Sequence, residues 1–471
     1  MRPVLIRLFY CTCENKKRFE MEKKNTEAGL DYANGRIVPL FGKIFFPTLL
    51  GLLFNALLTV IDGIFVGQGV GADGIAAVNI IAPLYMVVTG IGLMFGIGSS
   101  VVAGIAMSQG DHKKASVNMT QAMLLSVLAV GLLCLLLASV PETVVRLLGS
   151  SDRLLPHTMD YLLWLIPGIF FLLFESIGMM VIRLDGSPKY AMLCNVIPSV
   201  INIVLDWYFV FPLDMGVKGA AIATSASIVV GAAMVLLYFL RFSYVLRFCW
   251  DLQGFFVNIW RQIRVGSSAF VTEIAMSVMM FTGNYVFMRH FGEAGVAAYS
   301  IACYLFPLIF MMSTAVAQSA QPIISFNYGA ANTARVRAAF RVSFLTALFC
   351  GVFITVSIAL GARGIVAMFI DPACEAGVLA SRGLPVFALC AVFFAANMAI
   401  IGFFQSVEQA AKALVFTLLR GIIYLVPLFF LMPVLLPARG VWAAIPCSEI
   451  LTLLTIGVVL AVSWGCRRKG A

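Results

Sequence analysis

Four acidic side chains lie inside long apolar segments of this sequence. They are Asp62, Glu175, Asp206 and Glu273. An ionisable group at the centre of a bilayer costs roughly 2.5–3.5 kcal/mol on insertion scales, so such groups usually serve a function. Buried carboxylates can hold a proton, bind Na⁺ or attract a cationic substrate. Each of them could instead only join two helices through an ion pair or a hydrogen bond.

Three of these acids have polar neighbours at helical spacing, so each set occupies one face of a helix. The sets are Asn55, Thr59 and Asp62; Asn195, Ser199, Asn202 and Asp206; and Glu273, Ser277, Met280 and Asn284. We expect each face to turn toward the interior of a helix bundle, because lipid offers no hydrogen-bonding partners.

Two kinds of cation chemistry fit the acids of the first half. If Asp62 and Asp206 meet, repulsion between buried carboxylates favours holding a proton near neutral pH. Na⁺ would instead require several oxygen ligands, which Asp62, Asn202 and Asp206 could supply together. The candidate coupling residues are Asp62, Asn202, Asp206, Glu175 and Asn195, and the candidates for a cation or substrate site in the second half are Glu273 and Asn284.

The composition requires a surface that faces lipid. Hydrophobic residues make up 61% of the chain and charged residues 11%, whereas soluble domains carry about 25% charged residues. A bilayer admits only helices or closed barrels, and a barrel would alternate in polarity along segments of about 10 residues. The sequence shows unbroken apolar stretches instead, such as 122–140. We therefore predict an all-α polytopic membrane protein.

Apolar segments of the length that crosses a bilayer, roughly 20 residues, predict about twelve transmembrane helices. They lie near residues 38–66, 75–107, 119–140, 157–182, 190–212, 217–240, 260–288, 295–326, 340–361, 383–406, 412–435 and 440–464. The first, second, seventh and eighth are longer than a bilayer requires, so we expect these helices to tilt or bend.

The basic residues concentrate on alternate loops, for example at Lys113 and Lys114, between 241 and 264, and between 335 and 341. Such an excess is typical of cytoplasmic loops. We therefore predict a bacterial inner-membrane protein with both termini in the cytoplasm. The same distribution argues against nucleic acid as a partner, despite the net charge of +10. The basic stretch before Met21 lacks a signal-peptide cleavage site, and we expect translation to start at Met21.

The second half of the chain repeats the first. DGIFVGQGVGADGIAAVNI, from Asp62, parallels NYVFMRHFGEAGVAAYSI, from Asn284. Two six-helix repeats of the same orientation would form two pseudo-symmetric bundles suited to alternating access. The predicted organisation is a cytoplasmic tail at 1–35, an N-lobe at 36–241, a linker at 242–258, a C-lobe at 259–464 and a cytoplasmic tail at 465–471.

The membrane interior is expected to be electronegative, because Arg420 is the one basic residue deep within a predicted span. This favours cationic or neutral cargo. Abundant Met (22) and Phe (38) are compatible with flat, apolar cations. Glu408 and Glu449 lie near predicted span ends, where we expect structural or interfacial roles.

Five motifs resemble the multidrug and toxic compound extrusion (MATE) family, and most closely its MepA-like branch. They are TVIDGIFVG, RLDGSPK, NIVLDWYFVF, GVKGAAIAT and QPIISFNYGA, in that order from Thr59 to Ala330. The resemblance covers about residues 36 to 464. It implies two six-helix lobes in a V shape, a monomer, and antiport of drugs against H⁺ or Na⁺.

The resemblance also implies roles for particular residues. Asp62, Asn202 and Asp206 match a coupling network of the N-lobe, and Glu273 matches a cation-binding glutamate of the C-lobe. Gln318, Gln321 and Asn327 belong to a motif of mainly structural role. The sequence departs from the family at Met179, where a polar residue is expected, and in the tenth helix, where Asn397 and Gln405 occur without an acid.

A lipid-linked saccharide flippase and a membrane-embedded enzyme are the alternatives to an exporter. A lipid-linked saccharide flippase would need basic residues along its cavity for phosphate, and these are largely missing. A membrane-embedded enzyme would need a catalytic motif, but the sequence contains no HExxH, GxSxG or P-loop. The leading hypothesis is thus a secondary transporter of organic cations that requires no cofactor besides its coupling ion.

Overall fold

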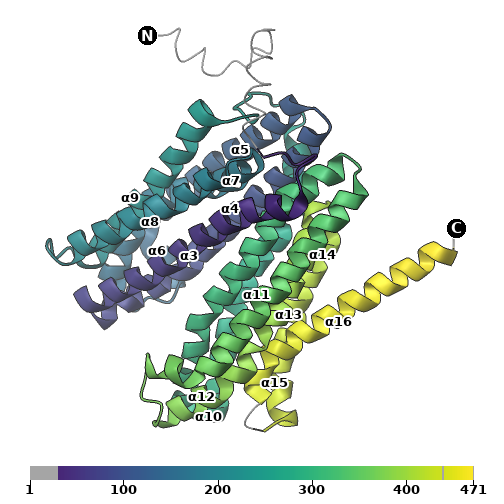
Figure 1. The fold of residues 1–471 in the computed structure, drawn as a ribbon. Helices are drawn as coiled ribbons and strands as arrows, with labels where there is room; N and C mark the ends of the chain where they lie inside the picture. Colours follow the sequence, from purple (N-terminus) through teal and green to yellow (C-terminus); the bar gives the residue numbers. More distant parts are fainter. Residues whose placement is uncertain (1–29, 438–439, 470–471) are drawn as a thin grey trace, which may run out of the picture. The chain divides into compact units, whose positions relative to one another are not determined.

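The computed structural model describes residues 30–437 and 440–469, and this part of the chain is built from helices joined by short loops (Figure 1). Met21 and most of the predicted N-terminal tail lie outside the described residues. Two short π-helical turns carry the label η. The elements are α3 Ile37–Gly69, α4 Ala72–Ser108, α5 His112–Ser139, α6 Pro141–Leu147, α7 Leu155–Leu184, α8 Pro188–Val210, α9 Gly216–Leu237, η1 Tyr238–Phe242, α10 Phe255–Gly329, α11 Thr333–Ala367, α12 Glu375–Ala388, α13 Cys390–Ser406, α14 Ala410–Leu418, η2 Leu419–Ile423, α15 Leu425–Leu435 and α16 Gly440–Lys469.

Eleven continuous helical segments of the described chain are long and apolar enough to cross a membrane. One of them, α10, holds 75 residues and contains both the seventh and the eighth predicted spans. Its two arms meet at Gly292, where φ is 61° and the backbone leaves the helical conformation. Glycine adopts this φ without the steric cost that a Cβ would add. The prediction of an all-α membrane protein with about twelve spans is confirmed.

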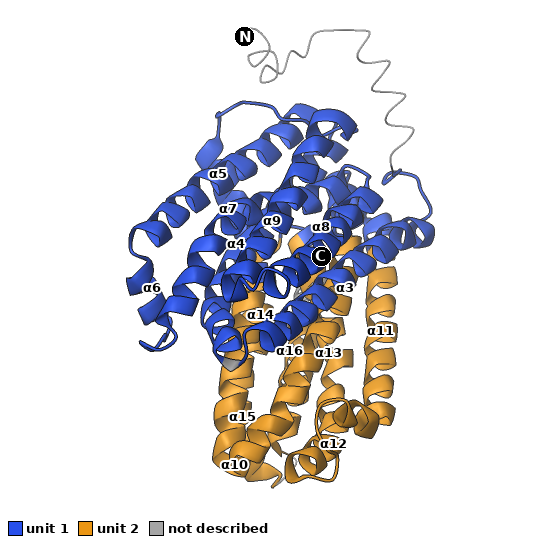
Figure 2. Ribbon diagram, turned by 90° about the vertical axis from the view of Figure 1, so that its left-hand side faces the viewer, with its two compact units in different colours: residues 1–270, 321–337, 406–408 blue, residues 271–320, 338–405, 409–471 orange. Residues whose placement is uncertain are grey.

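The chain divides into two compact units (Figure 2). Unit 1 comprises Met1–Phe270, Gln321–Arg337 and Ser406–Glu408, and unit 2 comprises Val271–Ala320, Ala338–Gln405 and Gln409–Ala471. Each unit therefore combines segments that lie far apart in the sequence.

The core of each unit is formed by apolar faces of its own helices. In unit 1, α7 packs against α4, α5 and α9, and buries Leu162, Ile169 and Ile177 completely. In unit 2, Phe287 stacks on Tyr299 with ring centroids 4.5 Å apart and meets Trp442 edge-on at 4.8 Å. Phe287 and Tyr299 lie on opposite arms of α10, so this cluster joins the two arms to α16.

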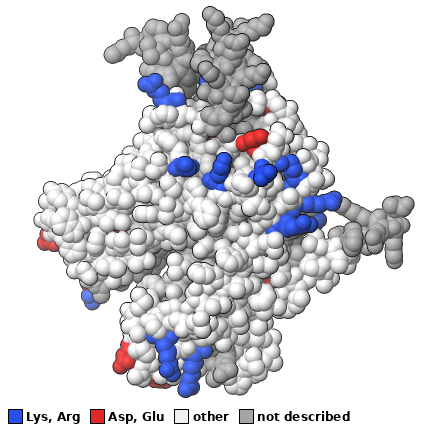
Figure 3. Space-filling view, in the orientation of Figure 1, with Lys and Arg blue, Asp and Glu red and all other residues white. Residues whose placement is uncertain are grey.

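The outer surface is largely uncharged. Figure 3 shows Lys and Arg side chains gathered in a few places on one face, with broad areas between them free of visible charge. Large apolar side chains, such as Leu360 and Phe349 of α11, lie exposed on the surface. Lipid is the solvent that this surface suits.

The segment that connects the predicted lobes is held against unit 1 by one buried carboxylate. Asp185, which follows α7, accepts hydrogen bonds from the Tyr238 hydroxyl at 2.8 Å and from three consecutive backbone N–H groups. These donors are Tyr244 N at 2.7 Å, Val245 N at 2.9 Å and Leu246 N at 2.8 Å. Burial raises the pKa of the Asp185 carboxyl to about 6, although these hydrogen bonds act to lower it.

We expect the variant Asp185→Asn to change how stability depends on pH. The pKa of Asp185 in the folded protein lies above its ordinary value of 3.8, so the folded state binds the proton more tightly than the unfolded state does. Lowering the pH from 7 to 5 should therefore stabilise the wild type by about 1 kcal/mol relative to Asp185→Asn. Thermal unfolding in detergent at both pH values would measure this. If the difference in stability between wild type and Asp185→Asn were the same at both pH values, the raised pKa of Asp185 would be contradicted.

Candidate functional site

The carboxyl groups of Asp62 and Asp206 lie within hydrogen-bonding contact of each other in unit 1. Asp62 comes from α3 and Asp206 from α8, two helices that pack along each other. The Oδ1 atoms of both are buried without a hydrogen-bond partner among the described residues. Two carboxyl groups can share a hydrogen bond only if one carries a proton. The contact between the two carboxyl groups therefore requires a bound proton, or a cation in its place.

Asn202 fixes the other side of Asp206. When its amide oxygen accepts a hydrogen bond from Thr224 N at 3.1 Å, its amide nitrogen donates to Asp206 Oδ2 at 2.8 Å. In this orientation the oxygen is occupied by α9 and points away from a cation that Asp206 would bind. Among the described residues, no group of three or more His, Cys, Asp or Glu side chains could hold a metal ion.

The polar face predicted for α8 lies inside unit 1. Asn195, Ser199, Asn202 and Asp206 are all buried. Asn195 Nδ2 donates to the sulfur of Met179 at 2.9 Å. Met179 is the position where a polar residue is expected from the family pattern, and its thioether takes the place of a polar acceptor for Asn195.

Glu175 occupies the α7 side of the same unit, one helical turn before Met179. Its side chain is buried and lies against Gly231 of α9, where a Cβ would come within 2.1 Å of Glu175 Oε1. Gly231 therefore provides the space that the carboxylate fills. Tyr85 lies close enough to interact electrostatically with both Glu175 and Asp62.

Tyr85, Tyr161 and Thr224 were not identified from the sequence. Tyr161 is buried near Asp62 and Asp206, whereas Thr224 acts through its backbone. Aromatic residues are common throughout these helices, so no spacing pattern separates the two tyrosines from packing residues.

Two predicted polar faces do not turn inward as expected. Asn55 and Thr59 on α3 are exposed, and the Thr59 hydroxyl donates to the Asn55 carbonyl at 3.2 Å. A threonine that bonds to its own helix needs no interior partner, which explains the difference. In unit 2, Glu273 is buried but Asn284 is exposed. The structure therefore does not bring Asn284 together with Glu273.

The motif at the end of α10 makes structural contacts within unit 1. Asn327 Nδ2 donates to the carbonyl of Tyr32 at 3.0 Å, and Asn327 Oδ1 accepts from Arg335 Nε at 2.9 Å. Arg335 Nη2 donates to the carbonyls of Tyr32 and Gly35 at 3.0 and 2.8 Å. These bonds attach the segment before α3 to the end of α10.

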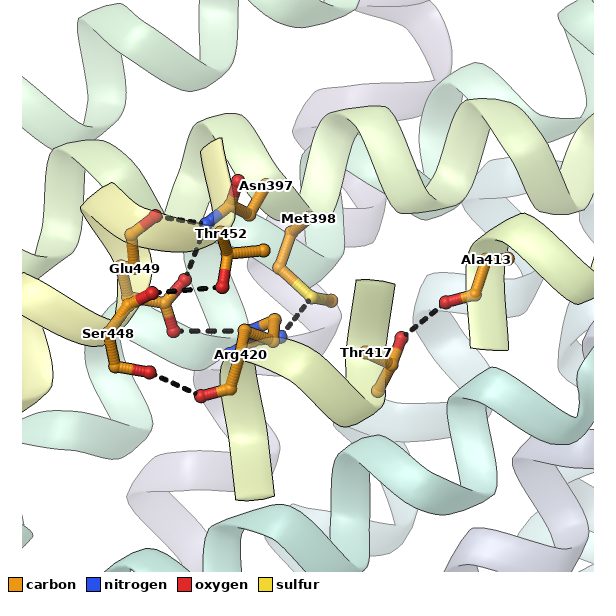
Figure 4. A network of polar contacts seen from close by, with 8 residues as sticks. All are labelled: Asn397, Met398, Ala413, Thr417, Arg420, Ser448, Glu449 and Thr452. Carbon is orange, nitrogen blue, oxygen red and sulfur yellow. Dashed lines mark hydrogen bonds and ion pairs between the residues drawn. The ribbon is translucent and has the colours of Figure 1, made fainter. Parts of the chain in front are cut away.

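Unit 2 contains a buried ion pair, shown in Figure 4. Arg420 Nε donates to Glu449 Oε1 at 3.1 Å, and Asn397 Nδ2 donates to Glu449 Oε2 at 2.7 Å. The guanidinium also lies over the ring of Phe394, 4.0 Å from its centroid. The sequence predicts Glu449 near a span end in a structural or interfacial role. The residue instead lies within α16, and its buried ion pair with Arg420 gives it a structural role.

The π-helical turn η2 explains the position of Arg420. Its backbone shifts to i→i+5 bonding, as in Tyr424 N to Leu419 O at 2.8 Å. The carbonyl of Arg420 instead accepts a hydrogen bond from the Ser448 hydroxyl at 2.6 Å (Figure 4). π-Helical turns inside α-helices often mark functional positions.

A small cavity adjoins this ion pair. It has a volume of about 20 Å³, and Met276, Met279 and Phe310 line it together with Arg420 and Glu449. This is room for about one water molecule. An organic compound could enter only if the surrounding side chains moved.

The chain matches the model of a known protein family. The family model described as MatE matches residues 47–208 and 268–431, which together cover more than half of the chain. Among curated proteins, "Multidrug export protein MepA" of Staphylococcus saprophyticus is 25% identical over 424 residues, covering 88% of this chain and 91% of the relative. The protein of the same name from Staphylococcus aureus strain MRSA252 is 23% identical over 421 residues, with the same coverage.

Solved structures share the fold. An outward-facing MATE-family transporter of the MOP superfamily superimposes with a TM-score of 0.85 at 23% identity, covering 93% of this chain and 97% of the other. A MATE structure in a straight conformation gives a TM-score of 0.83 at 25% identity, covering 93% and 98%.

We expect single substitutions of the buried ion pair to destabilise the protein. Arg420→Met leaves Glu449 buried without its counter-charge, and a loss of this kind costs about 3–5 kcal/mol. The double variant Arg420→Met/Glu449→Leu should recover most of the loss, because no charge remains to be buried. Thermal unfolding in detergent measures both. Arg146→Met, which removes two exposed ion pairs, with Glu142 and Asp152, is the control and should change stability little. A double variant less stable than either single variant would refute the expectation.

Proposed function

Because the chain belongs to the MatE family, we propose that it is a cation-coupled antiporter that exports amphipathic, mostly cationic organic compounds by alternating access. The observation that carries the proposal is the contact between Asp62 and Asp206, which places two carboxyl groups in a buried site of unit 1. Relatives named as multidrug export proteins support organic compounds as the cargo.

The geometry favours H⁺ over Na⁺ as the coupling ion. Na⁺ would require several oxygen ligands at one place. The oxygen of Asn202 is engaged with Thr224, while its amide nitrogen faces Asp206. A proton needs only the shared hydrogen bond between Asp62 and Asp206. The partnerless Oδ1 atoms of the two residues can accept a further donor or water.

The proposed cycle follows from the charge of this pair. When the site opens outward, a proton enters, binds between Asp62 and Asp206, and removes one negative charge. The attraction for a cationic cargo weakens, and the cargo leaves. When the site opens to the cytoplasm, the proton departs and the two carboxylates attract the next cation. Glu175 would add negative charge nearby, and Asn195 would help to position α8 through its bond to Met179.

Unit 2 would contribute to the preference for cations. Arg420 is neutralised by Glu449, so the pair has no net charge. Glu273 remains as a buried acid of the same unit. The pairing of Arg420 with Glu449 also weakens the alternative function, a lipid-linked saccharide flippase, because a flippase requires basic residues that can bind the phosphate groups of its substrate.

The proposal includes a setting for the protein. It would lie as a monomer in the bacterial cytoplasmic membrane with both termini inside, as the distribution of basic residues indicates. The N-lobe at 36–241 and the C-lobe at 259–464, joined by the linker at 242–258, would be the moving parts.

We expect purified protein in proteoliposomes to export a fluorescent organic cation when a pH gradient is imposed, and not when a Na⁺ gradient is imposed alone. Asp206→Asn should abolish the response, because a neutral amide cannot exchange the proton. Asp160→Asn, an exposed acid at the start of α7, is the matched control and should transport normally. Export driven only by Na⁺ would refute proton coupling, and no export under either gradient would refute the function.

We expect Gly231→Ala to reduce transport without unfolding the protein. The added Cβ would overlap with Glu175 Oε1 at 2.1 Å, and the carboxylate can move because it is the end of a flexible side chain. Gly131→Ala is the control, since its Cβ would meet Phe170 at an ordinary distance of 3.5 Å. Efflux rate and thermal stability should be measured for both. Normal transport by Gly231→Ala would exclude a role for the position of Glu175.

A further inference from the structure

The beginning of α10 and the segment before it carry exposed aromatic side chains. Phe256, Val257 and Trp260 are 85%, 72% and 63% exposed, and Trp250 and Leu252 are also largely exposed. All of them belong to unit 1. An exposed apolar surface of this kind usually marks an interaction site.

The exposed side chains occupy one face of the helix. Phe256, Trp260 and Arg264 are spaced i, i+4, i+8 and are exposed. The opposite face is buried against unit 1 through Ile259 and Gln262, the latter donating to the Asn118 carbonyl at 3.0 Å. The face that packs on the protein thus includes a glutamine, whereas the outer face is aromatic and basic.

The length of α10 places this face at the edge of the bilayer. The arm before Gly292 covers residues 255–291, which at 1.5 Å per residue is about 55 Å. A bilayer is about 40–45 Å thick including its headgroups, of which the hydrocarbon core takes about 30 Å. The arm is therefore too long for the hydrocarbon core alone, and the basic residues Arg261 and Arg264 favour its first turns as the part in the headgroup region.

The preceding segment is fixed to the protein by its backbone. Arg247 N donates to Ser116 Oγ at 3.3 Å, and Cys249 N donates to Thr120 Oγ1 at 3.0 Å. Both acceptors lie on α5, and Asp185 holds the three residues before Arg247. The exposed side chains of Arg247 and Trp250 consequently project from an ordered base.

The charge of this surface is positive. The nearby acids are engaged, since Asp251 lies 3.6 Å from Lys113 and Glu408 forms a two-point ion pair with Arg261 at 2.6 and 2.7 Å. Arg247 and Arg264 are exposed at either end of the aromatic surface. Arginines beside interfacial aromatic residues suit the phosphate of an anionic lipid.

We propose that Trp250, Phe256, Val257 and Trp260, with Arg247 and Arg264, form a binding surface for anionic phospholipid of the cytoplasmic leaflet. The aromatic side chains lie among the upper acyl chains and glycerol groups, and the two guanidinium groups bind headgroup phosphate. The connection between the lobes is thus a membrane-bound element rather than a solvated loop. Binding of this kind is independent of which cargo or coupling ion the protein uses.

The test uses the full chain in phosphatidylcholine vesicles that contain a fixed minor fraction of brominated lipid, a quencher of tryptophan fluorescence. Brominated phosphatidylglycerol should quench more strongly than brominated phosphatidylcholine at the same fraction. The excess should fall as salt is added, because exposed charges are screened. Arg247→Gln and Arg264→Gln should each lower the apparent preference for phosphatidylglycerol about fivefold. Arg337→Gln, an exposed arginine elsewhere in unit 1, should leave it unchanged.

Substitution of the tryptophans shows which residues give rise to the excess quenching. Trp250→Phe and Trp260→Phe together should remove the excess quenching by phosphatidylglycerol while transport and thermal stability persist. Equal quenching by the two brominated lipids in the wild type would overturn the proposal, as would an excess that survives loss of both arginines. Quenching of these tryptophans by aqueous acrylamide but by neither lipid would also overturn it, and would assign the surface to a soluble partner.

Discussion

A bilayer supplies no hydrogen bonds, and the need to satisfy polar groups within the protein governs this structure. Several polar side chains of the spans find partners on neighbouring helices. Asn195 uses a methionine sulfur, Asn202 uses Asp206 and the backbone of α9, and Asn397 uses Glu449. Where a carboxyl oxygen is buried without a partner, as at Asp62 and Asp206, the structure leaves a place that a mobile proton can fill.

The two units differ in how they bury charged groups. Unit 1 brings two carboxyl groups together, so its charge depends on whether a proton is bound. Unit 2 pairs Arg420 with Glu449, and the cost of burying each charge is reduced by the other. In the proposed function the charge of the first arrangement changes with protonation, whereas the charges of the second neutralise each other. Coupling at unit 1 and a stable electrostatic background in unit 2 would follow from this difference.

The segment between η1 and α10 shows that a connection between helices can be ordered without being helical. Asp185 binds three consecutive N–H groups, and α5 binds two more through hydroxyl groups. Backbone groups that would otherwise be left to water are satisfied by the protein. The exposed side chains of the segment can then take the membrane-facing position that we propose for them.

The sequence alone determined that the surface faces lipid and that the fold is helical, because a chain with 61% hydrophobic residues in long unbroken segments can build only a lipid-facing helical protein. It also determined that α8 has one polar face, since helical periodicity follows from the backbone. Only the tertiary structure decided which polar groups meet. Helical spacing gives a direction around one helix but not the identity of the neighbouring helix. For that reason the contact between Asp62 and Asp206, the pairing of Arg420 with Glu449, and the exposure of Asn284 depended on how the helices pack.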